Sequence, residues 1–340
     1  MIELKILLHS DKLKQIEKSG VGRAIKHQMK ALELNNVEYT LNTKDDYDII
    51  HINTIFPESY LIGKKAKKNG KKVIFHAHST EEDFRNSFLF SNQVAPAFKV
   101  WLKKVYSSAD LILTPTPYSK SLLENYNLGK PIVDISNGIE LEFFKKDKQA
   151  GKKFREHFKF SNDDKVIISV GLYIERKGIL DFVEMAKKLP DYKFVWFGYT
   201  NLNTVPPKIK EAVQTKLDNL YFPGYVEREV LKGAYSSADL FWFPTKEETE
   251  GIVLLEALAM KIPVLIRDIP IYEGWLEDGK NLYKAKTFKE FKDKIEGIVE
   301  KKIPNLTEEG YKIAKERDIK IIGKQLKQIY KDVLNGKYDK

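Results

Sequence analysis

Residues 243–264 read Phe-Pro-Thr-Lys-Glu-Glu-Thr-Glu-Gly-Ile-Val-Leu-Leu-Glu-Ala-Leu-Ala-Met-Lys-Ile-Pro-Val, and this stretch decides the fold of the chain. The apolar run 240–243 predicts a strand that ends where the stretch begins. A turn with three acids follows: Glu247, Glu248 and Glu250. Gly251 then opens a segment of good helix formers that ends near Lys261, and Pro263 stops it. The pattern therefore predicts a strand, an acidic loop and a helix in close succession.

The start of the predicted helix is typical of an anion-binding site. The backbone N–H groups of Gly251, Ile252 and Val253 have no acceptor within the helix and favour a phosphate. Glu248 lies before these groups on the loop, and Glu256 lies further along the helix. A nucleotide sugar has a matching layout, with ribose and hexose hydroxyls on either side of a diphosphate. The alternative is a surface helix with an acidic first turn, which the helix macrodipole also favours.

The spacing Glu248-x7-Glu256, followed by Ala-Leu-Ala-x-x-x-Pro-Val, resembles the donor-site signature of the retaining glycosyltransferases of family 4. That family has the GT-B fold, an α/β architecture of two facing Rossmann-like domains with parallel sheets. Residues 248–256 most resemble the version found in bacterial glucosyl-diacylglycerol and diglucosyl diacylglycerol synthases. The resemblance covers the whole chain and is most specific over residues 165–265.

The composition limits the class of protein. The chain has 340 residues, of which 42% are hydrophobic and 31% charged, which fits two soluble domains of ordinary size. It has no apolar run of about 18 residues and no cysteine, so we expect neither a membrane-spanning helix nor a disulfide or thiolate site. The net charge of +10 indicates an anionic partner, which is a nucleic acid, an anionic lipid or a phosphorylated substrate.

Strand-like and helical stretches alternate along the chain, which predicts parallel α/β domains. The sequence Tyr-Ser-Ser-Ala-Asp-Leu occurs at 106–111 and again at 235–240, each time before an apolar run and a Pro-Thr pair. Such a repeat indicates that the second half of the chain repeats the element order of the first. We predict four parts: an acceptor-binding domain (1–145), a linker (146–160), a nucleotide-sugar-binding domain (161–320) and a last helix (321–340). In the GT-B fold, such a helix often crosses back onto the first domain.

A glycine pair opens the first helix of the predicted acceptor domain. Gly20 and Gly22 follow a strand over residues 2–9 and a polar loop, but Ile25 replaces the third glycine of a dinucleotide fingerprint. We therefore interpret Gly22 as a point of close backbone approach to a ligand in the cleft. An ordinary helix start is the alternative.

Two histidines stand at the end of another predicted strand, 71–76. A histidine in this position is more often structural than catalytic. The family resemblance nevertheless places His78 at the cleft, near the transferred sugar. His76 is the weaker candidate, because we expect it to point the other way.

The loop after the strand 165–170 carries the second part of the predicted donor site. In the family, an arginine directly after the first glycine of this loop and a lysine before the later glycine bind the diphosphate. Lys177 matches the lysine, whereas Leu172 stands in place of the arginine. Arg176 is near enough to substitute, and it is therefore a candidate donor-binding residue.

No stretch of the sequence predicts a metal site. Asp46-Tyr47-Asp48 matches the Asp-x-Asp string of a different glycosyltransferase fold, but here it leads into a strand. The six histidines are scattered, and none has the spacing of a zinc ligand pair. We expect no metal and no cofactor, with the nucleotide sugar as a substrate.

A basic and aromatic surface is predicted on the acceptor domain. Residues 58–72 form a lysine-rich helix, and residues 84–109 combine positive charge with aromatic side chains, as an interfacial membrane surface would. The predicted membrane-binding residues are Lys64, Lys65, Lys67, Lys68, Lys71, Lys72, Phe98, Trp101, Lys103 and Lys104. A solvated basic helix beside a core helix is the alternative. We expect the protein on the cytoplasmic face of the membrane, bound peripherally.

The resemblance implies a retaining, metal-independent hexosyltransferase that moves glucose from UDP-glucose to monoglucosyl diacylglycerol. In that scheme Glu256 accepts hydrogen bonds from the ribose, and Glu248 accepts them from the hexose 3- and 4-hydroxyls. Lys177 and the N–H groups at 251–253 stabilise the leaving UDP, and His78 orients the hexose or the acceptor. Glu248, His78 and Lys177 are thus the predicted catalytic residues.

Two alternatives remain open at this point. One is a water-soluble family 4 enzyme of capsule or polysaccharide synthesis. The other is a basic nucleic-acid-binding protein, although the sequence has neither an RNA-recognition nor a helix-turn-helix signature. The sequence leaves open glucose or galactose as the donor sugar, the linkage, the number of sugars added and the oligomeric state.

Overall fold

Two parallel β-sheets of six strands each form the framework of the protein in the computed structural model, which describes residues 4–12, 16 and 19–339. The first sheet has the order β2(Glu38–Thr40), β1(Lys5–His9), β3(Ile49–Ile52), β4(Lys72–His76), β5(Leu111–Thr114), β6(Ile132–Asp134). The second has the order β12(Tyr283–Ala285), β11(Val264–Arg267), β10(Leu240–Phe243), β7(Lys165–Val170), β8(Tyr192–Phe197), β9(Leu220–Gly224). The α/β prediction of two facing Rossmann-like sheets is confirmed. The part of the predicted first strand before residue 4 lies outside the described residues.

The strand order of each sheet places a crevice at a defined position. Read from β9, the second sheet runs 3-2-1-4-5-6 in chain order, which is that of a dinucleotide-binding domain. In such sheets the order reverses between the first and fourth strands, here β7 and β10, and ligands bind beyond their carboxyl ends. The first sheet reverses between β1 and β3. The loops after these strands are therefore the expected site.

An aspartate at the start of a strand ties neighbouring strands together at three places. In the two copies of the repeat, Asp110 accepts a hydrogen bond from the N–H of Val73 (2.9 Å), and Asp239 accepts one from that of Val166 (2.8 Å). Each aspartate also donates its own N–H to the carbonyl of the same partner. Asp48 forms the same pair of contacts with Lys5. The sequence repeat thus encodes the same contact between neighbouring strands in both sheets.

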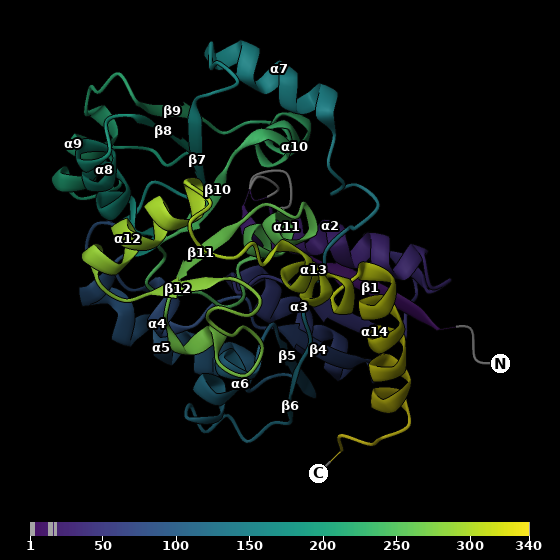
Figure 1. Ribbon diagram of the computed structural model, residues 1–340. Helices are drawn as coiled ribbons and strands as arrows, with labels where there is room; N and C mark the ends of the chain where they lie inside the picture. The colour runs from purple at the N-terminus through teal and green to yellow at the C-terminus, as the bar shows by residue number, and fades with distance from the viewer. Residues whose placement is uncertain (1–3, 13–15, 17–18, 340) are drawn as a thin grey trace.

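Helices cover the sheets and complete the two domains (Figure 1). On the first domain they are α2(Gly20–Glu33), α3(Pro57–Lys68), α4(Glu81–Phe84), α5(Ser91–Tyr106) and α6(Pro117–Glu124). On the second they are α7(Lys148–Phe158), α8(Ile179–Lys188), α9(Pro207–Gln214), α10(Arg228–Ser237), α11(Ile252–Ala259), α12(Phe288–Val299) and α13(Thr307–Glu316), with short 3-10 turns η1(Glu175–Lys177) and η2(Pro270–Tyr272). The last helix, α14(Ile319–Leu334), packs Leu326 and Tyr330 into the same core as Ile6 and Ile49 of the first sheet.

The stretch predicted as a linker, 146–160, contains helix α7. Asp147 caps this helix by accepting a hydrogen bond from the N–H of Ala150 at 3.0 Å. Phe154 is buried against α10, where Gly233 leaves room for the backbone of Ala150. Because the large apolar residues lie after position 153, the charged beginning of the stretch conceals an amphipathic helix. The exact domain boundaries stay a prediction.

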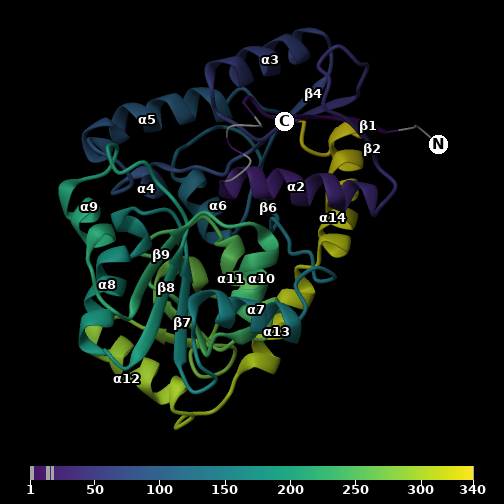
Figure 2. The same cartoon turned by 90° about the horizontal axis from the view of Figure 1, so that it is seen from above.

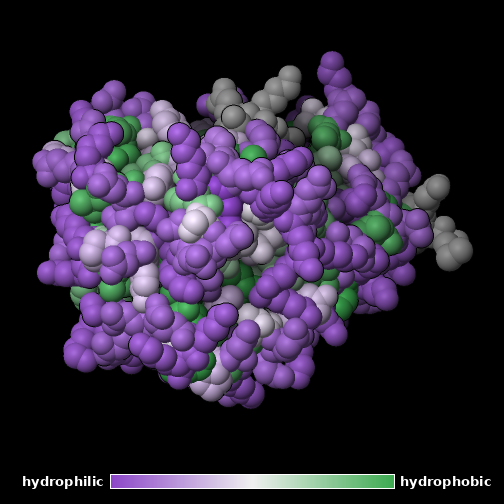
Figure 3. All heavy atoms as spheres, turned by 45° about the horizontal axis from the view of Figure 1, so that its top comes forward, coloured by the Kyte–Doolittle hydropathy of each residue, from purple (hydrophilic) through white to green (hydrophobic). Residues whose placement is uncertain are grey.

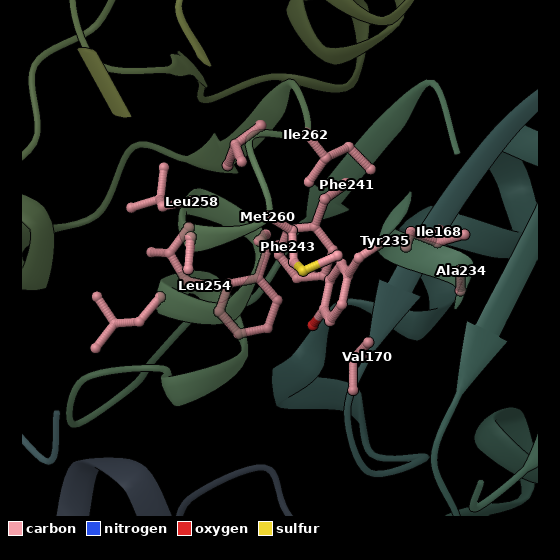
Figure 4. Close-up of a cluster of buried hydrophobic side chains, with 14 of the residues drawn as sticks. Ile168, Val170, Ala234, Tyr235, Phe241, Phe243, Leu254, Leu258, Met260 and Ile262 are labelled. Carbon is pink, nitrogen blue, oxygen red and sulfur yellow. The ribbon is translucent and has the colours of Figure 1, made fainter. Parts of the chain in front are cut away.

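Helix α11 lies inside the second domain, between the sheet and the other elements that cover it. Its side chains are apolar on all sides except at Glu256, and nearly all of them are buried. Leu254 and Leu258 share a core with Phe243 of β10 and Tyr235 of α10 (Figure 4). A short helix held on several sides has a fixed position, so the groups at its beginning are also fixed.

The outer surface is mainly polar. On the face shown in Figure 3, hydrophilic residues cover most of the area and hydrophobic residues form small, separate patches. Within the described residues, no helix combines the length and the apolar composition needed to cross a membrane.

Candidate functional site

Loops at the carboxyl ends of the two sheets meet each other. Thr116, after β5, donates its hydroxyl to the carbonyl of Thr249 on the loop after β10, at 2.9 Å. Asn137, after β6, donates its backbone N–H to the carboxylate of Glu250 at 3.0 Å. The predicted donor loop of the second domain is therefore in direct contact with the first domain.

Lys177 and Glu248 form a buried ion pair at the point where the second sheet reverses its order. Lys177 Nζ donates to Glu248 Oε1, and the hydroxyl of Thr245 donates to the same oxygen at 3.0 Å. Lys177 also lies over the ring of Phe243, with Nζ 5.7 Å from the ring centroid. Burial raises the pKa of Glu248, but the charges of Lys177 and Arg176 outweigh it and hold that pKa below its ordinary value. The sequence predicted both residues for the site, and the structure brings them together.

A close approach of two backbones sets this geometry. Gly178, directly after Lys177, has φ +82°, a conformation that residues with a side chain rarely adopt. A Cβ at this position would lie 2.8 Å from the carbonyl carbon of Pro244, on the loop after β10. Glycine therefore lets the loops after β7 and β10 touch, which places Lys177 beside Glu248.

Helix α11 begins at Ile252, and Gly251 is its N-cap residue with φ +86°. The first N–H groups of a helix have no acceptor within it, so those of Ile252 and Val253 are available to a ligand. This start lies between Glu248 on the loop and Glu256 in the helix. The predicted helix and its free N–H groups are thus in the expected place, although the helix starts one residue later.

Glu256 forms a buried ion pair with an arginine of the other domain. Arg23 of α2 donates Nη1 to Glu256 Oε1, and the hydroxyl of Tyr235 donates to Oε2 at 3.1 Å. Glu256 is 0% exposed, and burial raises its pKa against the opposing charge of Arg23. No sequence pattern singled out Arg23. Its position directly after Gly22 marks it as close to the expected ligand, but does not indicate its partner.

Arg176 has a different environment from the one expected. It forms an ion pair with Asp83 of the first domain, at 2.8 Å. It also donates to the backbone carbonyl of Glu247 at 2.6 Å and to the hydroxyl of Ser87 at 3.3 Å. Glu248 lies 3.9 Å away. Arg176 thus joins the two domains beside the predicted donor site, and its contact with a diphosphate stays a prediction.

Glu247 and Glu250, which flank Glu248, face the first domain. Glu250 is buried and accepts hydrogen bonds from Ser136 and Asn137. Glu247 accepts a hydrogen bond from the hydroxyl of Tyr118 at 3.3 Å. Burial raises the pKa of Glu247 to about 7, and the nearby Asp83 raises it further. Two acids of the loop thus contact the first domain, whereas Glu248 contacts Lys177 of its own domain.

His78 is buried in a stack of histidines at the end of β4. Its Nε2 lies 2.9 Å from Asn53 Oδ1, and its ring stacks on that of His76 with 4.2 Å between the ring centroids. His76 in turn contacts Gln28 and His51. The expectation that His76 points away is wrong, because residues two apart in an extended chain point to the same side. Burial lowers the pKa of His78 to about 3, so its ring is neutral at physiological pH.

Gly22 is buried in the first turn of α2. Its N–H donates to the side chain of the N-cap residue Ser19 at 3.2 Å. This N–H group is therefore used in capping the helix. The close approach of Gly22 to a ligand stays a prediction.

The predicted membrane surface is only partly exposed. Trp101 packs against the first core and donates Nε1 to the carbonyl of Ile55 at 2.7 Å, and Phe98 packs against the same core. Three lysines have acidic partners: Lys67 with Asp110, Lys71 with Asp46 and Lys72 with Asp339. The prediction that Phe98 and Trp101 supply the apolar part is corrected, because their apolar sides face inward on α5. The exposed large apolar side chains of this region are Leu61, Phe88, Leu89, Phe90, Val94 and Val100.

The Asp-x-Asp string lies away from this site. Asp46 is exposed and pairs with Lys71, and Asp48 is the strand-start aspartate bound to Lys5. Within residues 4–12, 16 and 19–339, no group of three or more acidic or histidine side chains is arranged to hold a metal ion.

Family models match both halves of the chain. The model of glycosyl transferases group 1 matches residues 151–317, and that of glycosyltransferase family 4 matches residues 23–143. The processive diacylglycerol alpha-glucosyltransferase of Acholeplasma laidlawii is 44% identical over 337 residues, with 98% of this chain and 100% of the relative covered. The chain belongs to the group 1 glycosyltransferases. The family resemblance predicted from residues 248–256 is confirmed.

More distant relatives of this glycosyltransferase agree with that assignment. The alpha-galactosylglucosyldiacylglycerol synthase of Streptococcus pneumoniae is 23% identical, with 81% of this chain and 75% of the relative covered. The crystal structure of Anabaena HepE with UDP and glucose matches with a TM-score of 0.75 at 16% identity, over 96% of this chain and 99% of that one. This second likeness shows the GT-B fold.

Proposed function

We propose that this glycosyltransferase moves glucose from UDP-glucose to monoglucosyl diacylglycerol, with retention of the α configuration. The observation that carries the proposal is the pair of carboxylates, Glu248 and Glu256, on either side of the start of α11 at the reversal point of the second sheet. The near full-length relative that bears the name of a diacylglycerol alpha-glucosyltransferase supports the choice of acceptor.

The arrangement suits a reaction in which UDP leaves and the acceptor enters on the same face. The bond between the glucose C1 and the β-phosphate oxygen breaks, and the acceptor oxygen bonds to C1. The acceptor proton passes to the departing phosphate, so no protein base is needed. Lys177 and the N–H groups at the start of α11 stabilise the negative charge that develops on UDP. Glu256 accepts hydrogen bonds from the ribose, and Glu248 accepts them from the glucose.

His78 orients the hexose rather than moving a proton. A histidine with a pKa of about 3 is not protonated near pH 7 and cannot act there as a general acid. Its hydrogen bond with Asn53 holds the ring in one orientation. A neutral, fixed ring is suited to a hydrogen bond with a sugar hydroxyl.

The reaction is proposed to need no metal ion, because Lys177 and the helix N–H groups can neutralise the phosphate charge. Activity in excess EDTA tests this. We expect the rate to remain near that of the untreated protein. Complete loss that is restored by added Mg²⁺ or Mn²⁺ contradicts the proposal.

The protein is proposed to work at the cytoplasmic face of the membrane, bound through two adjacent helices. α3 and α5 lie at the margin of the first domain, on the side away from α12 (Figure 2), and Tyr60 of α3 contacts Trp101 of α5. We define the α3–α5 surface by its exposed residues: Leu61, Lys64, Lys65, Lys68, Val94, Val100, Lys103 and Lys104. These lysines have no acidic partner among the described residues. Basic and apolar side chains together favour an anionic lipid surface.

A labelling experiment tests the donor and the acceptor together. Purified protein is incubated with radiolabelled UDP-glucose or UDP-galactose and with vesicles of phosphatidylglycerol that contain monoglucosyl diacylglycerol. Parallel reactions contain water-soluble sugars in place of the vesicles. We expect the label in the lipid extract as a glycolipid with one more hexose. Label only in water-soluble products contradicts the lipid acceptor, and transfer from UDP-galactose alone contradicts the donor.

A further inference from the structure

Arg23 of the first domain contacts the predicted donor site directly. It stands in the first turn of α2, beyond the carboxyl end of β1, and its guanidinium pairs with Glu256 in α11 of the second domain. The side chain of Arg23 keeps 21% of its surface exposed, whereas that of Glu256 keeps 1%. The arginine therefore lies at the edge of the pair that is open to solvent.

The contact with Glu256 occupies only part of the Arg23 guanidinium. An arginine has five N–H donors in a planar fork, and within the described residues one of its nitrogens has a hydrogen-bond acceptor. A buried ion pair between domains adds little stability by itself, because removing both charges from water offsets their attraction. An anchored arginine with free donors is, however, well suited to bind a phosphate in two places.

The second domain supplies few cations to the proposed donor site. A diphosphate brings two negative charges to a loop that already carries Glu247, Glu248 and Glu250. The second domain offers Lys177, but Leu172 stands where an arginine was expected, and Arg176 is bound to Asp83. The opposite domain can supply a second positive charge.

We propose that Arg23 is a donor-binding residue, which contacts the diphosphate of the nucleotide sugar while Glu256 anchors it. This inference rests on the proposed function, since it requires a nucleotide-sugar donor. The two domains then share the diphosphate, with Lys177 and the start of α11 on one side and Arg23 on the other. Donor binding is thereby coupled to contact between the domains.

Binding of UDP and of uridine separates this role from a structural one. The full chain is titrated with UDP, and uridine is measured by competition, for the wild type, Arg23→Gln and the control Arg155→Gln. Arg155 is a well-bonded arginine of α7, held by the carbonyls of Ser161 and Ser237. We expect Arg23→Gln to weaken UDP binding at least tenfold and uridine binding less than about twofold. The control should leave both affinities unchanged.

Each other result overturns the inference. If Arg23→Gln binds UDP like the wild type, Arg23 does not touch the phosphates. If it loses UDP and uridine equally, Arg23 acts only by holding Glu256 at the ribose. If Arg23→Gln does not fold, Arg23→Lys replaces it. We then expect a smaller loss of UDP affinity and no loss of uridine affinity. A lower affinity for uridine again contradicts the proposed role. A wild type that binds no UDP refutes the proposed function itself.

Discussion

Glu248 and Glu256 carry the same charge, but the structure gives them different partners. Glu248 is bound to Lys177 and Thr245 within the second domain, whereas Glu256 is bound to Arg23 across the domains and to Tyr235. Glu248 precedes the start of α11 in the chain, and Glu256 lies within the helix. They should therefore bind different parts of the donor.

Substitution of each carboxylate by its amide tests this difference. We expect Glu256→Gln to weaken the binding of both UDP and UDP-glucose, because it removes a charged acceptor from the ribose. Glu248→Gln should leave UDP binding nearly unchanged and lower turnover. Losing a charged hydrogen bond in a closed site costs roughly 1.5–3 kcal/mol, or more than about tenfold. Titration with UDP measures binding, and steady-state assays measure turnover. Normal binding and normal turnover in the two variants would contradict the assigned site.

Glu247 should make stability depend on pH near neutrality. Its pKa is about 7, above the ordinary value for a glutamate, so its contribution is complete at low pH and is lost as the pH rises through 7. Glu247→Gln stays neutral and avoids this loss. The free energy of unfolding of the variant, relative to the wild type, should thus rise between pH 6 and pH 8, by about 1 kcal/mol or less. Thermal unfolding of both proteins at the two pH values measures this change. If the variant and the wild type differ in stability by the same amount at both pH values, Glu247 does not titrate in this range.

At the scale of elements, the contact between the loops after β7 and β10 positions the site. Gly178→Ala should push these loops apart, because the new Cβ would lie 2.8 Å from the carbonyl carbon of Pro244. Gly224→Ala is a matched control, since Gly224 also has φ +82° but a Cβ there would have no atom within 4 Å. Both variants carry backbone strain of about 1–2 kcal/mol, but Gly178→Ala adds the clash. We expect a lower Tm and weaker UDP binding for Gly178→Ala alone, and equal effects in both variants would show that the close approach is not needed.

The α3–α5 surface should bind anionic vesicles. Replacing Lys64, Lys65 and Lys68 by glutamine removes three charges from one face of α3, each worth about 1 kcal/mol near an anionic leaflet. Binding to phosphatidylglycerol vesicles should fall at least tenfold, while UDP binding stays unchanged. The same change at Lys148, Lys152 and Lys153 of α7 is the control for net charge. Vesicle co-sedimentation compares the two triple variants. Equal binding by both would show that the α3 lysines form an ordinary solvated surface.

The sequence predicted elements better than it predicted which way side chains face. The strand, the acidic loop and helix α11 were predictable because glycine, proline and apolar periodicity are local signals. The inward packing of Phe98 and Trp101 was not, because a single apolar helix face does not show whether it meets a core or a membrane. The pairing of Arg23 with Glu256 joins residues far apart in the chain, so no local pattern could indicate it.

At the scale of the whole molecule, the two domains are joined through the site itself. Arg23 with Glu256, Arg176 with Asp83 and Asn137 with Glu250 all connect residues beyond the carboxyl ends of the two sheets. These contacts bring groups proposed to bind the donor next to the domain proposed to hold the acceptor. Such an arrangement suits transfer of a sugar directly from one substrate to the other.

The anomeric configuration of the lipid product tests this account most directly. The protein is incubated with UDP-glucose labelled with ¹³C at C1 and with vesicles that contain monoglucosyl diacylglycerol, and the new linkage is read by NMR spectroscopy. Because UDP-glucose is α-linked and the acceptor is proposed to enter on the face that UDP leaves, we predict a diglucosyl lipid whose new linkage is α. A β linkage, or no labelled lipid at all, would contradict the account.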